Sequence, residues 1–151
     1  MLKFKIYNPN TKMSTLEKLN ATEFLFKHLE QYGDPKPDIE KAIKYSLKEI
    51  SSFGGFVLEG YDDDENIVGI VVINRTGMSG YIPENILVYI AVDNSQRGKG
   101  YGKLLMNKAI ELCDGNVALH VEKDNPAKFL YEKVGFTNPY LEMRLKKEPI
   151  N

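Results

Sequence analysis

A short glycine-rich stretch carries the most specific chemical signal in the sequence. Arg97-Gly98-Lys99-Gly100-Tyr101-Gly102 follows an apolar run, residues 86–92, and opens an amphipathic stretch. The N-terminus of a helix presents unpaired N–H groups and a partial positive charge, and glycines let the backbone approach a ligand closely. This combination predicts an anion site of the kind that binds a diphosphate.

The spacing of these residues narrows the class of diphosphate site. A P-loop requires G-x-x-x-x-G-K-[ST], and no Ser or Thr follows Lys103. A dinucleotide fingerprint requires G-x-G-x-x-G, and Lys103 again occupies the position of the third glycine. The pattern is instead Arg-x-x-Gly-x-Gly, in Arg97, Gly100 and Gly102. A nucleotide-phosphate enzyme is therefore disfavoured, and so is a glycine turn without a ligand.

Two segments together resemble the signature motifs of the GNAT acetyltransferases. The first runs from Ala91-Val92-Asp93 to Gly102, and the second is Asn125-Pro126-Ala127-Lys128-Phe129-Leu130-Tyr131-Glu132-Lys133-Val134-Gly135-Phe136. They occur in the order of the family and at about its separation. With the intervening strand, the resemblance covers residues 84–147, whereas the N-terminal half agrees only in the order of its elements.

The resemblance implies that acetyl-CoA is the cosubstrate. In this family, backbone amides of the first motif hold the pyrophosphate, and the strand before it splays from the next parallel strand to admit the pantetheine arm. An amide of the same strand would stabilise the oxyanion of the tetrahedral intermediate. The expected coenzyme-binding residues are Ile90, Ala91, Val92, Arg97, Gly98, Lys99, Gly100, Tyr101, Gly102, Asn125, Lys128 and Tyr131.

Two residues of the second motif each have two possible roles. Asn125 matches a position that contacts pantetheine in the family, and it can also cap the helix that begins near Pro126. Tyr131 matches the frequent general acid of the family. On an arbitrary helix it would be a core tyrosine with its hydroxyl at the edge, but within this motif we expect the hydroxyl to lie near the sulfur.

The expected reaction is direct attack of a neutral primary amine on the thioester. Cys113 lies on the apolar face of its helix, so we reject it as an acyl carrier. Tyr131 and Glu84 are the candidate catalytic residues, with Glu84 as the first candidate for the base. Because Glu84 stands at the start of its strand, a solvated loop glutamate is an equal alternative. Tyr89 could line the acceptor side, and His120 is a weaker candidate for the base.

The hydrophobic pattern predicts one α/β (α+β) fold. The resemblance to the GNAT acetyltransferases implies a mixed, mostly antiparallel sheet of six to seven strands with about four flanking helices, in which a splayed parallel pair forms the coenzyme cleft. Ser14 and Glu17 predict a capping box for a helix that carries Leu16, Leu19, Phe26 and Leu29. The acidic run 62–66 is interpreted as a hairpin turn, not a cation site. Strands are expected at 2–7, 56–61, 67–74, 86–92, 117–121 and within 136–146.

Composition limits the remaining possibilities. The chain has 151 residues, is 42% hydrophobic and carries a formal net charge of −1, so we expect a single domain, 1–151, that binds no nucleic acid. It contains one cysteine and neither a signal peptide nor a run long enough to span a bilayer, so we expect a cytoplasmic protein without a metal site. A homodimer is possible. A CoA-binding regulatory module without catalysis is the alternative function, and the amine acceptor stays open.

Overall fold

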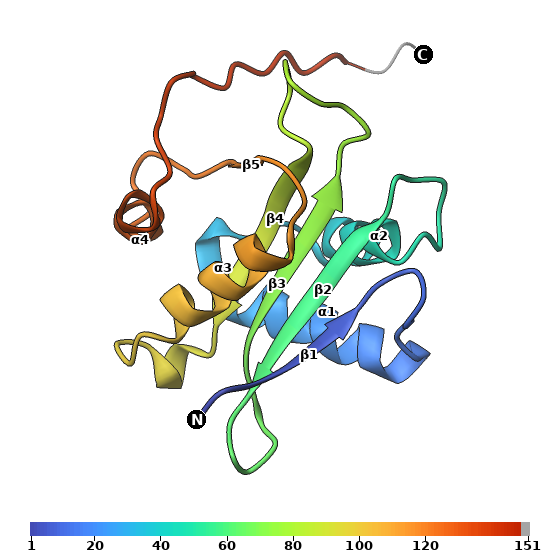
Figure 1. Cartoon of the computed structure of the whole chain (residues 1–151), viewed down its shortest axis with the longest axis vertical. Helices are drawn as coiled ribbons and strands as arrows, with labels where there is room; N and C mark the ends of the chain where they lie inside the picture. Colours follow the sequence, from blue (N-terminus) through green and yellow to red (C-terminus); the bar gives the residue numbers. More distant parts are fainter. Residues whose placement is uncertain (149–151) are drawn as a thin grey trace.

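A computed structural model describes residues 1–148, and its five strands form one sheet in the order β1-β2-β3-β4-β5. Neighbouring strands from β1 to β4 are antiparallel, and β4 and β5 are parallel. The predicted mixed, mostly antiparallel sheet with one parallel pair is therefore confirmed (Figure 1). The strands are β1 (Lys3–Tyr7), β2 (Gly55–Tyr61), β3 (Ile67–Arg75), β4 (Asn85–Val92) and β5 (Val117–Leu119).

Four α-helices flank the sheet, as predicted. Helices α1 and α2 cover one face and α3 and α4 lie on the other, so the molecule has three layers (Figure 1). Two short 3₁₀ helices, η1 and η2, follow α1 and β4. The bounds are α1 (Thr15–Leu29), η1 (Glu30–Tyr32), α2 (Lys36–Ser46), η2 (Asn94–Gln96), α3 (Tyr101–Leu112) and α4 (Ala127–Val134).

The two faces of the sheet bury separate apolar clusters. On β3, Ile70 and Val72 belong to the cluster under α1 and α2, whereas Val71 and Ile73 belong to the one under α3 and α4. Successive side chains of a strand point to opposite faces, so a strand covered on both sides is apolar throughout. This arrangement places β3 at the centre of the sheet and β4, which carries part of the candidate site, beside it.

The acidic segment between β2 and β3 is a turn, as the sequence indicated. The carboxylate of Asp62 accepts hydrogen bonds from the backbone N–H groups of Asp64 and Asn66, each at 2.9 Å. The side chain of Asp62 therefore holds the backbone of the turn.

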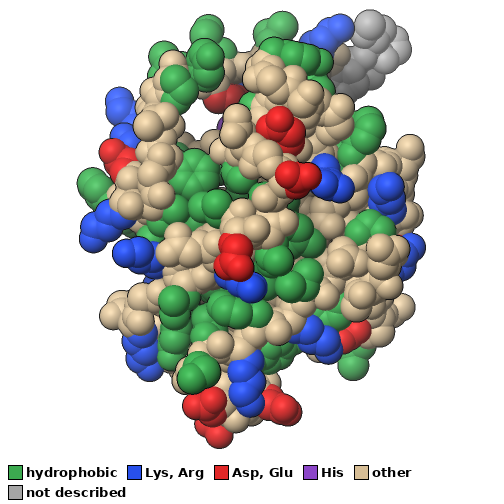
Figure 2. All heavy atoms as spheres, viewed as in Figure 1, with side chains coloured by type: hydrophobic (Ala, Val, Ile, Leu, Met, Phe, Trp, Pro, Cys, Tyr) green, Lys and Arg blue, Asp and Glu red, His purple; other side chains and the backbone are tan. Residues whose placement is uncertain are grey.

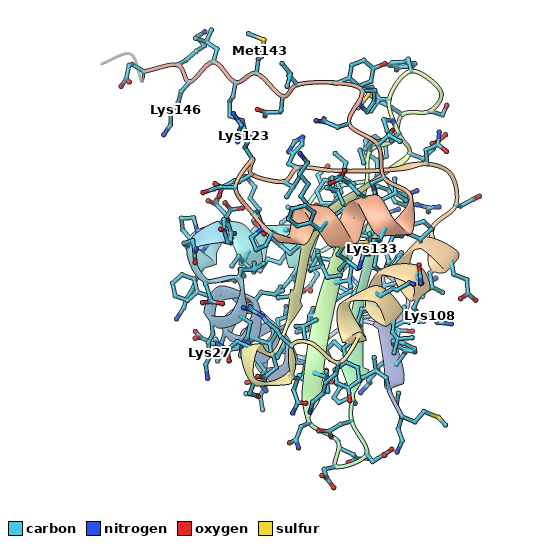
Figure 3. The ribbon with its side chains drawn as sticks, turned by 90° about the vertical axis from the view of Figure 1, so that its left-hand side faces the viewer. Lys27, Lys108, Lys123, Lys133, Met143 and Lys146 are labelled. Carbon is cyan, nitrogen blue, oxygen red and sulfur yellow. The ribbon has the colours of Figure 1, made fainter. Side chains whose placement is uncertain are left out.

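The prediction of six to seven strands is wrong for the described residues, because the expected final strand within 136–146 does not form. No helix or strand is assigned after α4 up to residue 148, and the last three residues of the expected domain lie outside the description. Strand β5 is only three residues long, so it offers a short edge for a further strand. Figure 3 shows Met143 directed away from the rest of the molecule, and Leu141, Met143 and Leu145 are 84–90% exposed.

None of the helices within residues 1–148 combines the length and the apolar character needed to cross a membrane.

Candidate active site

The parallel strands β4 and β5 part halfway along β4. Their register pairs run only from Asn85 with Val117 to Leu87 with Leu119. Beyond this point, β4 continues to Val92 with β3 as its neighbour on the other side. A strand edge without a neighbour presents N–H and C=O groups to a ligand that lies alongside it. Because β5 ends at Leu119, the second half of β4 has no described strand on this side, and its edge is free for such a ligand.

A bulge in β4 lies at this point. Val72 of β3 pairs with Tyr89, whereas the next residue, Ile73, pairs with Leu87, so Val88 has no register partner. A bulge adds one residue to a strand and redirects the side chains beside it. Here it lies where β4 leaves β5, and Tyr89 joins the cluster under α1 and α2.

The glycine turn at the start of α3 is open to solvent. Gly98 and Gly100 both have φ of 81°, which favours glycine, and a Cβ on either would meet nothing within 4 Å. Gly102, in contrast, lies in a crowded place, because a Cβ there would lie 3.1 Å from the side chain of Leu130 on α4. The first turn of α3 therefore packs against α4 on one side and leaves space above Gly98 and Gly100.

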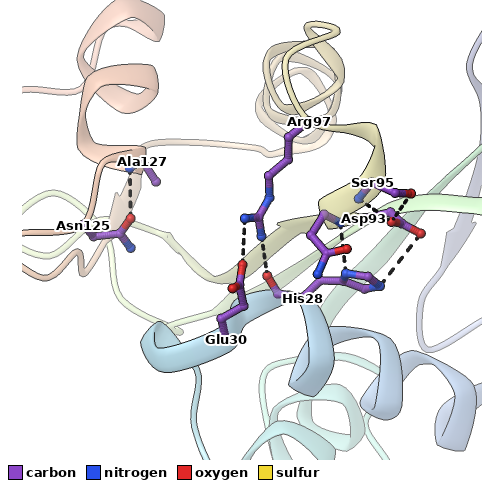
Figure 4. Close-up of polar contacts among 8 residues, drawn as sticks. His28, Glu30, Asp93, Ser95, Arg97, Asn125 and Ala127 are labelled. Carbon is purple, nitrogen blue, oxygen red and sulfur yellow. Dashed lines mark hydrogen bonds and ion pairs between the residues drawn. The ribbon is translucent and has the colours of Figure 1, made fainter.

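The basic side chains of the turn are held by neighbours. Arg97 donates 2.7 Å hydrogen bonds from its guanidinium to the carboxylate of Glu30 and to the carbonyl oxygen of His28 (Figure 4). The amine of Lys99 donates to the side-chain oxygen of Gln96, also at 2.7 Å. Arg97 thus lies in the predicted turn, but its guanidinium connects the turn to the end of α1.

Asn125 has the capping role that the sequence allowed. Its side-chain oxygen accepts a hydrogen bond from the backbone N–H of Ala127 at 2.9 Å, in the first turn of α4 (Figure 4). This contact leaves the amide nitrogen of the side chain for another partner, so the predicted contact with pantetheine is compatible with the cap. Lys128 follows on the same turn and is half-buried.

Tyr131 lies on α4 with its ring in the apolar cluster beneath α3. It is 9% exposed and makes an edge-on contact with Phe136, with ring centroids 6.2 Å apart. Burial raises the pKa of the Tyr131 hydroxyl, so the phenol keeps its proton at neutral pH. A protonated phenol is the state that a general acid needs.

Glu84 lies apart from the glycine turn. It precedes β4, whereas the turn follows the other end of this strand, roughly 25 Å away for eight extended residues. Its carboxylate accepts a 2.9 Å hydrogen bond from the backbone N–H of Asn116, and this bond is the main reason why the pKa of Glu84 is lowered. The structure therefore does not bring Glu84 to the other candidate residues. His120, exposed directly after β5, makes no side-chain hydrogen bond within residues 1–148.

The connection between α1 and α2 reaches the opening between β4 and β5. The hydroxyl of Tyr89 donates a 2.6 Å hydrogen bond to the carboxylate of Asp34. Burial, with a further contribution from Asp34, raises the pKa of Tyr89, so this phenol also stays protonated. Tyr32 donates to the carbonyl oxygen of Asp124, before α4, at 3.3 Å. This short connection thus contacts β4 and also the segment that follows β5.

Three residues of this region were not identified from the sequence: His28, Glu30 and Asp34. Asp34 lies in Gly33-Asp34-Pro35-Lys36-Pro37, a stretch whose glycine and prolines indicate a loop but give no partner for the carboxylate. His28 is 5% exposed and lies on the buried face of α1 with Ala21 and Leu25. Helical spacing alone could have placed it inward, but not beside the glycine turn.

Cys113 has the environment of a structural thiol. It is half-buried at the end of α3, and burial raises its pKa to about 11. At neutral pH the group is therefore a protonated thiol, which is a poor nucleophile. Within residues 1–148, no three side chains of His, Cys, Asp or Glu are placed to bind a metal ion together.

Known proteins share both the sequence pattern and the fold. The sequence model of the acetyltransferase (GNAT) family matches residues 15–136. A curated relative, the [ribosomal protein bS18]-alanine N-acetyltransferase of Haemophilus influenzae, is 35% identical over 78 residues, which is 49% of this chain and 50% of the relative. The chain thus matches about half the length of this relative.

Solved structures agree over almost the whole chain. A possible acetyltransferase from Clostridium difficile has a TM-score of 0.68 at 19% identity and covers 100% of this chain and 99% of its own. A ribosomal-protein-alanine N-acetyltransferase from Brucella melitensis has a TM-score of 0.64 at 17% identity and covers 97% and 100%. These likenesses show the fold. Because the family match covers most of the sequence and includes both motif segments, the chain belongs to the acetyltransferase (GNAT) family.

Proposed function

We propose that this protein transfers an acetyl group from acetyl-CoA to a primary amine. The observation that carries the proposal is the free edge of β4 beyond the end of β5, which leads to an open glycine turn at the N-terminus of α3. The turn would bind the diphosphate, and the free edge of β4 at Ile90 to Val92 would pair with the pantetheine arm. The family membership supports this assignment.

The residues present suit direct attack by the amine. An N–H of β4 beside the acetyl carbonyl would stabilise the oxyanion, and Tyr131 would donate its proton to the departing sulfur. Transfer through an enzyme thioester is disfavoured because the only cysteine, Cys113, is held as a protonated thiol. The amine gives its proton to solvent or to a base, and the products are the acetylated amine and free CoA.

The N-terminal α-amine of a polypeptide is the first acceptor to test. The relative from Haemophilus influenzae is named for acetylation of an alanine of a ribosomal protein. An α-amine has a pKa of about 8, so roughly a tenth is neutral at pH 7, against fewer than about one lysine side chain in a thousand. An α-amine therefore depends less on an enzyme base, which suits a site to which Glu84 is not brought.

The acceptor would enter beside the connection between α1 and α2. Asp34, held by Tyr89, supplies an exposed carboxylate near the point where β4 and β5 part. A carboxylate attracts the ammonium form of an approaching amine. Asp34 would thus hold the acceptor near the thioester before the amine loses its proton.

The placement of Glu84 also favours one alternative, a CoA-binding regulatory module without catalysis. The carboxylate proposed as the base is bonded to the backbone of Asn116. The two functions differ in one product, free thiol formed in the presence of an amine.

Calorimetry with CoA, followed by thiol release from acetyl-CoA, tests the proposal. The amine panel contains an alanine-starting peptide, its N-terminally blocked form, free lysine and a polyamine. We expect CoA binding and faster thiol release with the unblocked peptide. Lack of CoA binding at millimolar concentration would overturn the proposal. Binding without turnover on any amine would instead support the regulatory module.

A further inference from the structure

The end of α1 holds the glycine turn through two side chains. His28 accepts a hydrogen bond at Nδ1 from the backbone N–H of Asn94, at 3.0 Å, and its own carbonyl oxygen accepts from the guanidinium of Arg97, at 2.7 Å (Figure 4). Arg97 also bonds to the carboxylate of Glu30. One turn of helix therefore contacts both ends of the segment 94–97, which leads into Gly98.

The environment of His28 fixes its position and its tautomer. The ring is 5% exposed and contacts Phe24 at a centroid distance of 4.4 Å, with the ring planes tilted by 50°. Because Nδ1 accepts the hydrogen bond, the ring proton lies on Nε2, which faces the carboxylate of Asp93 at 3.9 Å. His28 is thus a neutral, buried acceptor, a role in which a protonated imidazole would fail.

The turn needs such an anchor. Gly98 and Gly100 lie in open space and have the freedom of glycine on both sides of φ = 0, so packing at these residues does not hold the turn. An ordered anion site requires its N–H groups to be aligned before the ligand binds, since ordering them on binding lowers the affinity. The contacts from α1 supply this alignment at the start of the turn.

The end of α1 is shaped to provide both contacts to Arg97. Glu30 follows the last residue of the helix with φ of 56° and ψ of −130°, a conformation that residues other than glycine rarely adopt. This backbone turn places the carboxylate of Glu30 beside the carbonyl of His28, so that one guanidinium bonds to both. Strain of this kind persists where other contacts maintain it.

We propose that His28 is a positioning residue for coenzyme binding: its neutral Nδ1 holds the backbone of Asn94 and so aligns the diphosphate-binding turn. The proposal rests on the proposed function, because it assigns the diphosphate of CoA to this turn. His28 does not touch the ligand and acts through the backbone of the turn.

Two substitutions separate the ring nitrogens. In H28N, the amide oxygen occupies the place of Nδ1 and keeps an acceptor for Asn94, whereas H28Q places its amide near Nε2 and leaves Asn94 without that acceptor. We expect the Kd for CoA to stay within about twofold in H28N and to rise roughly tenfold in H28Q, as for the loss of ~1.4 kcal/mol. T22V, a buried change on the same helix away from the turn, should leave the Kd unchanged.

A spectroscopic readout reports on the contact itself. The amide proton of Asn94 should exchange slowly with solvent in the wild type and in H28N, and faster in H28Q. If all variants bind CoA equally while H28Q loses this protection, the inference is wrong and the proposed function stands. If the wild type itself does not bind CoA, the proposed function and the inference are both overturned.

The Kd for CoA, measured between pH 7.5 and 5.5, provides a second test of the inference. Protonated His28 would carry a donor at Nδ1 facing the N–H of Asn94, so the wild type should lose affinity more steeply than H28N as the pH falls. Burial is the main reason why the pKa of His28 is lowered, so we expect the extra loss of affinity only at the acidic end of this range. Among the charges near the ring, Asp93 and Glu30 favour protonation, whereas Lys27 and Arg97 oppose it. The comparison with H28N removes the titration of the phosphates of CoA, and a steeper loss of affinity in H28N than in the wild type would overturn the inference.

Discussion

The hydroxyl of Tyr131 stays protonated at neutral pH because the side chain is buried among apolar residues. For Y131F we expect kcat to fall about tenfold to a hundredfold, with the KM for acetyl-CoA nearly unchanged, because a general acid acts in the transition state. The loss is limited because a thiol, with a pKa of about 8.5, leaves without much help. Thiol release measures the effect, and Y140F, at a position 85% exposed, is the control. Full activity in Y131F would leave only the packing role.

Glu84 is tested by the same assay in a different pair of variants. E84Q keeps an acceptor for the N–H of Asn116 but cannot accept a proton from the amine, whereas E84A loses both properties. The structure favours a role in holding the loop before β5, so we expect E84Q to keep kcat and Tm and E84A to lower Tm. A large loss of kcat in E84Q at unchanged Tm would show instead that Glu84 is the base.

Asp34 is the residue that should affect the acceptor alone. In D34N we expect the KM for a cationic amine to rise about three- to tenfold, since the attraction between unlike charges is lost. The KM for acetyl-CoA should stay the same. D64N, in the exposed turn between β2 and β3, is a control for the change in net charge. Equal changes in both variants would exclude a local role of Asp34.

At the scale of elements, the junction of β4, glycine turn and α3 is where backbone conformation and ligand binding meet. G100A forces a side chain into φ of 81° and should cost about 1 kcal/mol of unfolding free energy. It should also raise the Kd for CoA roughly tenfold, because the turn can no longer keep its conformation. Chemical denaturation and calorimetry measure the two effects.

G80A is a matched control for this change. Gly80 has φ of 76°, and a Cβ there would also meet nothing within 4 Å, but it lies between β3 and β4. We expect the same loss of stability without an effect on CoA. A Kd that changes equally in both variants would show that the glycine turn is not the binding site.

Helix α1 shows which features of a helix can be predicted from neighbouring residues in the sequence. The predicted capping box of Ser14 and Glu17 is present, with both of its hydrogen bonds. Three of its apolar residues lie outside the buried face, since Leu16, Leu19 and Phe26 are 46–64% exposed. The buried face consists of Ala21, Thr22, Leu25 and His28. His28, at the end of this face, reaches the segment before the glycine turn and accepts the backbone N–H of Asn94.

Among residues 1–148, one acid outside the candidate site is buried. Glu59 on β2 is 3% exposed and accepts a 2.6 Å hydrogen bond from Tyr61. Burial raises the pKa of Glu59, so the folded protein binds this proton more tightly than the unfolded chain. Its contribution to stability is therefore full below the unfolded pKa and is lost as the pH rises through the folded value.

Replacing Glu59 tests this predicted pH dependence of stability. E59Q keeps an acceptor for Tyr61 and removes the buried charge, so we expect a higher Tm at pH 7 and a smaller difference at pH 4. Thermal unfolding monitored by circular dichroism measures both. E49Q, on the loop after α2, is a comparison for the loss of one partly exposed carboxylate. A lower Tm of E59Q at pH 7 would show that the ionised carboxylate stabilises the fold.

At the scale of the whole molecule, the C-terminal stretch after α4 is not packed against the layers of the fold (Figure 2). Hydrophobic side chains remain at the surface on this face, and an opening separates the C-terminal stretch from the layers below. The alternating pattern of Leu141, Met143 and Leu145 predicts a strand, but a strand also needs a neighbour with free backbone groups. The homodimer expected from the sequence stays a prediction.

The sequence by itself determined the order of the elements as far as α4 and the place of the glycine turn, because periodicity, caps and glycine spacing act between near neighbours. The parallel pair was expected from the family resemblance. Only the tertiary structure decided that Arg97 bonds to Glu30, 67 positions earlier, that Glu84 holds the loop before β5, and that His28 anchors the turn. These contacts depend on how helices lie against the sheet, and that packing is a property of the whole chain.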